Sequence, residues 1–231
     1  MRRCWLFYGD AWGFADFARR QQDEALKSLR GALAAVKRAR NAQPTVEYFL
    51  FSDTVVCLRE LPEGNQRDQE SIDKGFGEII AVVQFLISEL LDADLLLRGI
   101  VTFGNLHREG DNEVIIGDAL LDAAEFERQA VSPPLVFLPA VALQKAQKAA
   151  GCSRQLCKSN VDRSVYVATK DGGVIRAQPI VGDRHELLAK YLQRALERAT
   201  LNDPVSPRNA GALKAALDLV NSTVKNGRKM A

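Results

Sequence analysis

The sequence predicts an α+β fold with a split βαβ, ferredoxin-like core. Short apolar runs rich in aromatic and β-branched residues predict strands, and two long segments with apolar residues at helical spacing predict helices. Their order is strand, helix, hairpin, helix, strand, strand, helix, strand, which is typical of a split βαβ core. This order differs from an alternating doubly wound fold, and the chain has no Gly-x-Gly-x-x-Gly or Walker-type loop.

In the first half of the chain, composition marks where each element ends. Pro44 stops a long helix that carries apolar residues on one face, and a polar stretch over residues 61–70 separates a hairpin from a second long helix with a denser apolar face. The predicted elements are strand 4–9, helix 15–40, strands 46–51 and 54–60 joined as a hairpin, and helix 71–92.

The second half of the chain continues with shorter elements and then two more helices. Ser132-Pro133-Pro134 ends one helix, and an apolar strand resumes directly after it. We expect one domain over 1–231, with a core at about 4–140, an extension over 141–224 and a disordered tail over 225–231. The predicted elements are strand 95–103, a polar loop at 105–112, strand 114–116, helix 117–130, strand 135–138, helix 139–150, strand 165–168, and helices 184–200 and 209–224.

The composition excludes several classes of protein. The chain is 47% hydrophobic and 26% charged with a net charge of +2, which is ordinary for a globular protein and gives no global attraction to nucleic acid or membrane. No apolar stretch is long enough to span a membrane, and the N-terminus lacks a signal peptide pattern, so we expect a cytoplasmic protein. Cys152 and Cys157 have no second pair and no neighbouring His, which disfavours zinc.

Two aspartates at the ends of predicted strands carry the strongest chemical signal. Asp10 follows the first strand, and Asp53 lies at the turn of the hairpin. A carboxylate at the end of a core strand is costly unless it is paired, hydrated or bound to a cation. These strand ends are neighbours in a split βαβ sheet, so a pair of Mg²⁺ or Mn²⁺ ions facing phosphates is the leading interpretation. The alternative is two ordinary turn residues, an N-cap and a hairpin aspartate.

Two further features suggest contacts to phosphate. Gly13 and Phe14 follow Asp10 at the predicted start of a helix, where backbone amides attract anions. Arg98 lies in an apolar strand and therefore needs a partner. It can pair with Asp10 or Asp53 or reach a phosphate, and we favour the phosphate, because nearby Gly99 and Gly104 leave room for a ligand or for close backbone approach.

The remaining polar candidates have simpler explanations. Asp118 is placed to cap a short helix, and the other acidic residues on that helix fit a solvated surface. His107 and His185 have no Ser or Cys at a recognisable catalytic spacing, which argues against a hydrolase triad. Those other acidic residues are Asp122, Glu125 and Glu127.

These motifs together resemble the class III nucleotide cyclases over roughly residues 5–140. Asp10-Ala11-Trp12-Gly13-Phe14 resembles the Asp-x-x-Gly-Phe of that superfamily, and Ser52-Asp53-Thr54 resembles its second metal-aspartate hairpin. The segment 98–104 resembles a further strand of the superfamily. The helix at 117–127, followed by Ala130 and Pro133-Pro134, is similar to the Gly-Pro-Ala-Leu helix of the bacterial pyrimidine cyclases of Pycsar antiphage defence.

The resemblance implies a cyclase domain that forms a homodimer with active sites at the interface. Asp10 and Asp53 are expected to bind two divalent ions, Mn²⁺ or Mg²⁺, with help from the backbone of Ala11. Arg98 is expected to neutralise phosphate charge while the ribose 3′-hydroxyl attacks the α-phosphorus and pyrophosphate leaves. The product would signal to a separately encoded cyclic-nucleotide-binding effector, and we expect no direct contact with nucleic acid or membrane.

The sequence departs from the purine cyclases at two places. Asp122 and Phe126 stand in the register of their Asn-x-x-x-Arg pair, and the lysine that reads adenine is replaced by the aromatic pair Tyr48 and Phe49. Both departures favour a pyrimidine substrate, with UTP slightly ahead of CTP. Tyr48 is our candidate for contacting the base, and strand parity decides between it and Phe49. Asp118 replaces the proline of the pyrimidine cyclases.

Three other hypotheses stay open. The missing Asn/Arg pair suggests a degenerate cyclase-like module that binds nucleotide and dimerises without turnover. A purine nucleotide cyclase is a second alternative. A diguanylate cyclase or polymerase-palm relative shares the core, but it requires a Gly-Gly-Asp/Glu-Glu-Phe hairpin where Ser52-Asp53-Thr54 stands.

Overall fold

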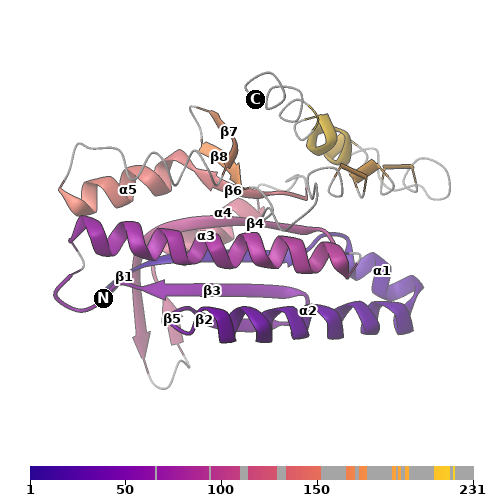
Figure 1. The fold of residues 1–231 in the computed structure, drawn as a ribbon, viewed down its shortest axis with the longest axis horizontal. Coiled ribbons are helices and arrows are strands. Elements are labelled where there is room, and N and C mark those ends of the chain that lie inside the picture. The colour runs from indigo at the N-terminus through magenta and orange to yellow at the C-terminus, as the bar shows by residue number, and fades with distance from the viewer. Residues whose placement is uncertain are drawn as a thin grey trace.

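A computed structural model describes most of the chain and all of the predicted core elements (Figure 1). The described residues are 1–65, 67–93, 95–109, 114–128, 134–151, 165–169, 172–175, 189–190, 192–193, 196–197, 211–218 and 221.

An eight-stranded sheet forms the centre of the fold, in the order β2-β3-β1-β4-β6-β8-β7, with β5 paired to β4. Strand β1 lies between β3 and β4 and is antiparallel to both, and β2 and β3 form a hairpin. This is the split βαβ arrangement, so the predicted α+β fold is confirmed. The strands are β1 (Arg2–Ala11), β2 (Glu47–Phe51), β3 (Thr54–Glu60), β4 (Leu97–Glu109), β5 (Val114–Ile116), β6 (Val136–Pro139), β7 (Val165–Thr169) and β8 (Gly172–Ile175).

Helices cover the two faces of this sheet unequally. Figure 1 shows the two long helices, α2 and α3, running along the sheet. They and α5 contribute to the larger apolar cluster, whereas α4 packs on β1 and β4 through the smaller cluster on the other face. The helices are α1 (Phe14–Arg20), α2 (Gln22–Ala42), α3 (Gln69–Asp92), α4 (Asp118–Arg128) and α5 (Ala140–Ala150).

The alternation of side chains along β1 assigns each residue to one of these faces. Trp5 and Phe7 point into the larger cluster, and Trp5 packs against Phe76 and Phe103 with ring centroids 4.9 and 4.8 Å apart. Leu6 joins the smaller cluster, and Tyr8 packs against it. Because residues two apart share a face, Asp10 projects from the face that carries Leu6 and Tyr8.

The structure differs from the predicted elements at three places. The predicted helix 15–40 is two helices, α1 and α2, which meet at Gln21 with φ −138° and ψ 68°. Strand β4 continues to Glu109 through a stretch predicted as a loop, because its polar residues pair with β5. Strand β8 was not predicted, since its Gly-Gly start reads as a turn.

Several predictions lie outside the described residues. They concern Cys152, Cys157, His185, the tail and most of the two C-terminal helices. Of those helices, residues 189–190, 192–193, 196–197, 211–218 and 221 are described and are helical. No helix in the described part of the chain combines the length and the apolar character needed to cross a bilayer.

Candidate functional site

The ends of β1 and of the β2–β3 hairpin meet at one edge of the sheet. Asp10 pairs with Thr54 in the β1–β3 register, directly beside the turn that holds Asp53. The backbone amide of Ala11 donates to the carbonyl oxygen of Asp53 at 3.0 Å. Ser52 turns the hairpin in a left-handed conformation, with φ 57°. The two predicted metal aspartates therefore lie at neighbouring points of one sheet edge.

Arg98 lies opposite Asp10 on β4, and the two side chains form an ion pair. Nε of Arg98 donates to Oδ1 of Asp10 at 3.0 Å, and NH2 donates to Oδ2. The side chains are only 23% and 16% exposed. A two-point guanidinium–carboxylate contact at this level of burial is one of the stronger side-chain interactions in proteins. The structure thus shows the ion pair that the sequence left as the alternative to a phosphate contact.

Glycines beside Arg98 serve packing within the protein. A Cβ atom at Gly99 would lie 2.4 Å from the carbonyl oxygen of Tyr8, and one at Gly104 would lie 2.6 Å from a carboxylate oxygen of Asp118. Both glycines therefore permit close approach of the chain to itself.

The carboxylates at this edge suit a hard divalent cation. Within the described residues, no hydrogen bond or ion pair engages the side chain of Asp53, which is partly exposed. Asp10 already attracts one cationic group, the guanidinium of Arg98. The described residues contain no cluster of three or more His, Cys, Asp or Glu side chains suited to a metal. A two-carboxylate site matches Mg²⁺ and Mn²⁺, which take remaining ligands from water and substrate phosphates.

The predicted phosphate contact at Gly13 and Phe14 has a local structure of its own. Gly13 is exposed and left-handed, with φ 75°, and its carbonyl accepts from the amide of Phe17 at 3.1 Å. The Phe14 ring is buried in the larger apolar cluster, so only its backbone is available to a ligand. Helix α1 has only 7 residues, so its dipole adds little to anion binding.

Strand parity separates the two aromatic candidates for base recognition. Phe49 packs against the smaller apolar cluster, on the sheet face that carries Asp10. Tyr48 packs against the larger cluster on the opposite face. The Tyr48 hydroxyl is buried and has no hydrogen-bond partner among the described residues, and burial raises the pKa of this phenol well above its usual range. The structure therefore brings Phe49, and not Tyr48, to the face of the two aspartates.

The acidic helix α4 is tied to α5 by a lysine that the sequence analysis did not select. Nζ of Lys145 lies 2.6 Å from Oδ2 of Asp122 and 3.4 Å from Oδ2 of Asp118. Burial alone would lower the pKa of Lys145, but the two aspartates outweigh it and raise this pKa above its ordinary value. Helix α4 begins at Asp118, whose carboxylate also accepts from the backbone amide of Asn105 and so links α4 to β4. Glu125 is exposed.

The sequence around Lys145 contains no motif that marks it as a functional residue. Its one signal is its position in α5, beside the buried residues Ala142 and Ala146. His107 is exposed on β4, opposite Ile116 of β5. The side chains of Phe126 and Glu127 lie outside the described set.

Comparisons with known proteins found similarity only at the level of structure. No protein family description and no curated protein sequence matches the chain. The adenylyl cyclase CyaB from P. aeruginosa shares 10% identity with it, covering 78% of this chain and 97% of that one at a TM-score of 0.45. The guanylyl cyclase Cya2 shares 14% identity, with coverages of 79% and 94% and a TM-score of 0.46.

A third solved structure is the catalytic core of a rhodopsin-guanylyl cyclase with converted specificity in complex with ATPalphaS. It shares 11% identity with this chain, covers 64% of this chain and 80% of that one, and has a TM-score of 0.46. All three overlaps have TM-scores below 0.5. They are too loose to assign an activity, so the function proposed below depends on the residues of this chain.

Proposed function

We propose that this chain is a nucleotide cyclase that converts a pyrimidine nucleoside triphosphate to its 3′,5′-cyclic monophosphate and pyrophosphate. UTP is the preferred substrate over CTP. The observation that carries the proposal is the juxtaposition of Asp10, Asp53 and Arg98 at one edge of a split βαβ sheet. Two carboxylates and one guanidinium are the groups that a reaction at a triphosphate requires.

Asp10 and Asp53 would hold two divalent ions, Mn²⁺ or Mg²⁺, together with the backbone of Ala11. When bound, such ions supply charge stabilisation and activation of the ribose 3′-hydroxyl. The fit rests on the donor set, because both side chains offer hard oxygen ligands, and the amide of Ala11 fixes the hairpin turn against β1 at 3.0 Å. Held on two rigid strand ends, the carboxylates keep their separation during the reaction.

Arg98 has two alternative partners in this proposal. Without substrate it holds the carboxylate of Asp10 at 3.0 Å through Nε. When a triphosphate arrives, its oxygens compete for the guanidinium, and the carboxylate of Asp10 becomes available to a cation. Arg98 then neutralises the charge that builds up on the phosphates as pyrophosphate departs.

Phe49 supports a small base as substrate. Its ring lies on the Asp10 face, half-buried and 6.0 Å from the guanidinium carbon of Arg108. A flat aromatic surface binds a nucleobase by stacking. An aromatic residue here, in place of a lysine, offers no donor to the ring nitrogens of a purine. This replaces Tyr48 as our residue for base contact.

A homodimer is the assembly expected for this activity. The Asp10 edge offers groups for metal and phosphate, and the ribose and base need further contacts from a second surface. Phe51 is 65% exposed on the same sheet face, and Leu121 is 60% exposed on α4. Large exposed apolar side chains favour a second protomer covering them.

The resemblance to the pyrimidine cyclases extends the proposal to signalling. In this role the cyclic nucleotide is a second messenger in antiphage defence and acts on a separately encoded effector. The proposed place of action is the cytoplasm.

A second candidate function is a nucleotide-binding and dimerisation module without turnover. The specific observation that favours it is the pair Asp122 and Lys145, at 2.6 Å, where purine cyclases carry an asparagine with its arginine four residues later. Such a module would bind triphosphate and release no product.

Mass spectrometry of the products tests the two candidates together. The purified chain is incubated with equimolar ATP, GTP, CTP and UTP plus Mn²⁺. A single cyclic pyrimidine monophosphate supports the leading proposal and names the substrate. A cyclic purine product contradicts the base assignment, and triphosphate binding in calorimetry without any cyclic product favours the module.

A further inference from the structure

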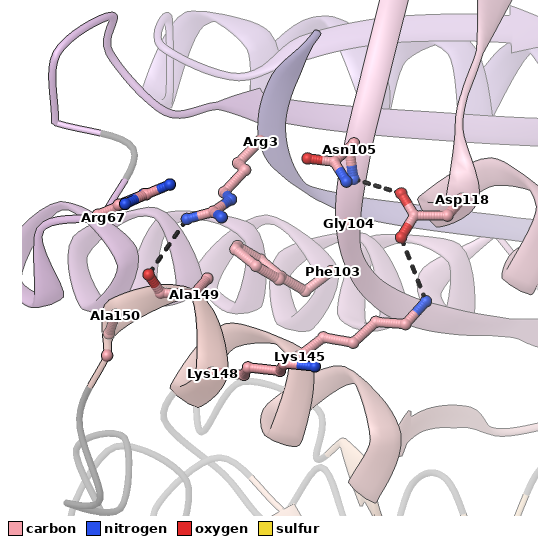
Figure 2. A pocket seen from close by; sticks show the side chains of 11 residues that line it. Arg3, Arg67, Phe103, Gly104, Asn105, Asp118, Lys145, Lys148, Ala149 and Ala150 are labelled. Atoms are coloured by element: carbon pink, nitrogen blue, oxygen red, sulfur yellow. Dashed lines mark hydrogen bonds and ion pairs between the residues drawn. The ribbon is translucent and has the colours of Figure 1, made fainter.

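A basic pocket lies at the opposite end of β1 and β4 from Asp10. It has a volume of about 490 Å³ and is lined by residues of β1, β4, α4, α5 and the segment before α3 (Figure 2). This size is within the roughly 300–1,000 Å³ of small-molecule sites. Arg3 pairs with Asn105 in the same register in which Asp10 pairs with Arg98. At about 3.4 Å per residue, the pocket is on the order of 24 Å from Asp10.

Positive charge dominates the lining. The lining holds the four cationic side chains Arg3, Arg67, Lys145 and Lys148 and one carboxylate, that of Asp118, and Lys145 is also paired with Asp122 outside the lining. Figure 2 shows Arg3 and Arg67 on one side of the pocket and both lysines on the side of α5. Convergence of like charges is unfavourable unless an anion is shared among them.

Two of the cations are held in place by the protein. NH1 of Arg3 donates to the carbonyl oxygen of Ala149 at 3.1 Å, and Lys145 is fixed by Asp122 and Asp118. The ammonium of Lys145 has three N–H donors, and its two aspartate contacts leave one for a ligand. Their fixed positions reduce the entropy that a ligand must overcome when it binds.

The other two cationic side chains have no partner in the described part of the chain. Arg67 and Lys148 are exposed, and neither has an ion-pair or hydrogen-bond partner within the described residues. The end of α5 explains only part of this arrangement, because Arg3 caps a carbonyl there while Arg67 and Lys148 do not. An anion between the two sides of the pocket would give Arg67 and Lys148 a partner.

We propose that this pocket binds a small polyanion that carries two or more linked phosphates, either a nucleotide or an inorganic polyphosphate. The phosphates lie between Arg3 and Arg67 on one side and Lys145 and Lys148 on the other. This site is separate from the Asp10 edge and does not depend on the cyclase proposal.

Calorimetry on the full chain in EDTA tests this inference, with inorganic tripolyphosphate, pyrophosphate and UTP as probes. EDTA removes divalent ions, which the Asp10 edge needs for phosphate. The Arg67→Gln/Lys148→Gln double variant is expected to bind tripolyphosphate roughly tenfold or more weakly. Its matched control is Lys27→Gln/Arg30→Gln, which removes the same charge from exposed positions on α2 and is expected to bind like the wild type.

The outcomes separate the ligand sources and the two sites. Tighter binding of UTP than of tripolyphosphate identifies a nucleotide site, and equal or tighter binding of tripolyphosphate identifies an inorganic polyphosphate site. The inference is overturned if the wild type binds none of the probes. It is also overturned if Arg98→Gln abolishes binding while Arg67→Gln/Lys148→Gln leaves it unchanged, because the phosphates then occupy the Asp10 edge.

Discussion

The backbone amide of Ala11 donates to the carbonyl oxygen of Asp53 across 3.0 Å. This bond joins the end of β1 to the turn between β2 and β3, and it fixes the spacing of the two strand ends that carry Asp10 and Asp53. Together with the ion pair of Asp10 and Arg98 on the other side of β1, it places three charged groups on neighbouring strands.

Arg98→Gln is expected to bind Mn²⁺ more tightly than the wild type when no nucleotide is present. In the wild type the guanidinium holds Asp10 and competes with the cation, and glutamine removes this competitor. A gain of roughly tenfold corresponds to losing a charge-assisted contact of modest strength. Electron paramagnetic resonance of free and bound Mn²⁺ measures the affinity directly.

The same variant should bind triphosphate more weakly, because one phosphate partner is lost. An Arg98→Gln/Asp10→Asn double variant serves as the control and is expected to lose the gain in Mn²⁺ affinity. Equal Mn²⁺ affinities for wild type and Arg98→Gln would show that the ion pair does not compete with the metal.

Phe49→Leu is expected to raise the KM for UTP by about tenfold with a smaller change in kcat, because stacking on a base contributes roughly 1–3 kcal/mol. Leucine preserves most of the apolar volume against the smaller cluster, so folding is largely retained. Steady-state kinetics and a thermal melt measure the two effects separately.

Tyr48→Phe is the companion test on the opposite face. It removes a buried hydroxyl that no group in the described part of the chain engages, so the free energy of unfolding should rise by about 1 kcal/mol or stay unchanged. The KM for UTP should not move. A large increase in KM for Tyr48→Phe, with none for Phe49→Leu, would contradict the account and assign base recognition to Tyr48.

Strand parity could not be predicted from the sequence, and that is why Tyr48 was our first candidate. Tyr48 and Phe49 are neighbours in a strand whose one charged side chain, Glu47, is at its first residue, and aromatic or apolar side chains follow on both faces. The register of β2 on β3 decides the matter, since a shift of one residue exchanges the faces. The two aspartates were predictable because carboxylates after apolar runs stand out.

The long elements were predictable because apolar spacing persists over many residues, as in α3 with its buried Ile72, Ile79 and Leu86. The limits of β4 were not, because its residues beyond Leu106 are all polar, and only their pairing with Val114–Ile116 makes them a strand. Lys145 was missed for a similar reason: its partners Asp118 and Asp122 are distant in sequence.

Gly77→Ala is expected to increase the free energy of unfolding by about 0.5–1 kcal/mol. The position is inside α3, and an added Cβ would meet no atom within 4 Å, so only the helix propensity changes. Chemical denaturation monitored by circular dichroism gives the value.

Gly75→Ala is the matched comparison, two residues away in the same helix. Its Cβ would lie 3.1 Å from Leu61 and 3.2 Å from Trp5, and Trp5 is held by two rings and by a 3.0 Å bond from its Nε1 to the carbonyl of Ile72. Because these contacts hold Trp5 in place, the free energy of unfolding of the variant should fall by about 1–3 kcal/mol. A gain in stability equal to that of Gly77→Ala would contradict this packing.

Asp68→Ala is expected to lower the melting temperature at neutral pH and to have less effect in acid. Asp68 caps α3 by accepting from the amide and hydroxyl of Ser71 at 2.9 Å, and the backbone bond is the main reason that the pKa of Asp68 is lowered from 3.8. The charged cap therefore stabilises the fold above pH 3.8, and this contribution is lost as the pH falls through the lower folded-state pKa.

Thermal melts between neutral pH and strong acid measure the difference in melting temperature between wild type and Asp68→Ala. Asp68→Asn retains a cap without a titrating group, so its melting temperature relative to Asp68→Ala should not depend on pH. A constant difference between wild type and Asp68→Ala across the whole range would exclude the charged cap.

The central claim is that Asp10 and Asp53 act as one site for cyclisation of a pyrimidine nucleoside triphosphate. The most direct measurement is the rate of cUMP formation from UTP and Mn²⁺ by wild type, Asp53→Asn and the exposed α2 control Asp23→Asn. The account predicts that wild type and Asp23→Asn form cUMP at equal rates and that Asp53→Asn is slower by about a hundredfold or more. Equal rates for wild type and Asp53→Asn would contradict it.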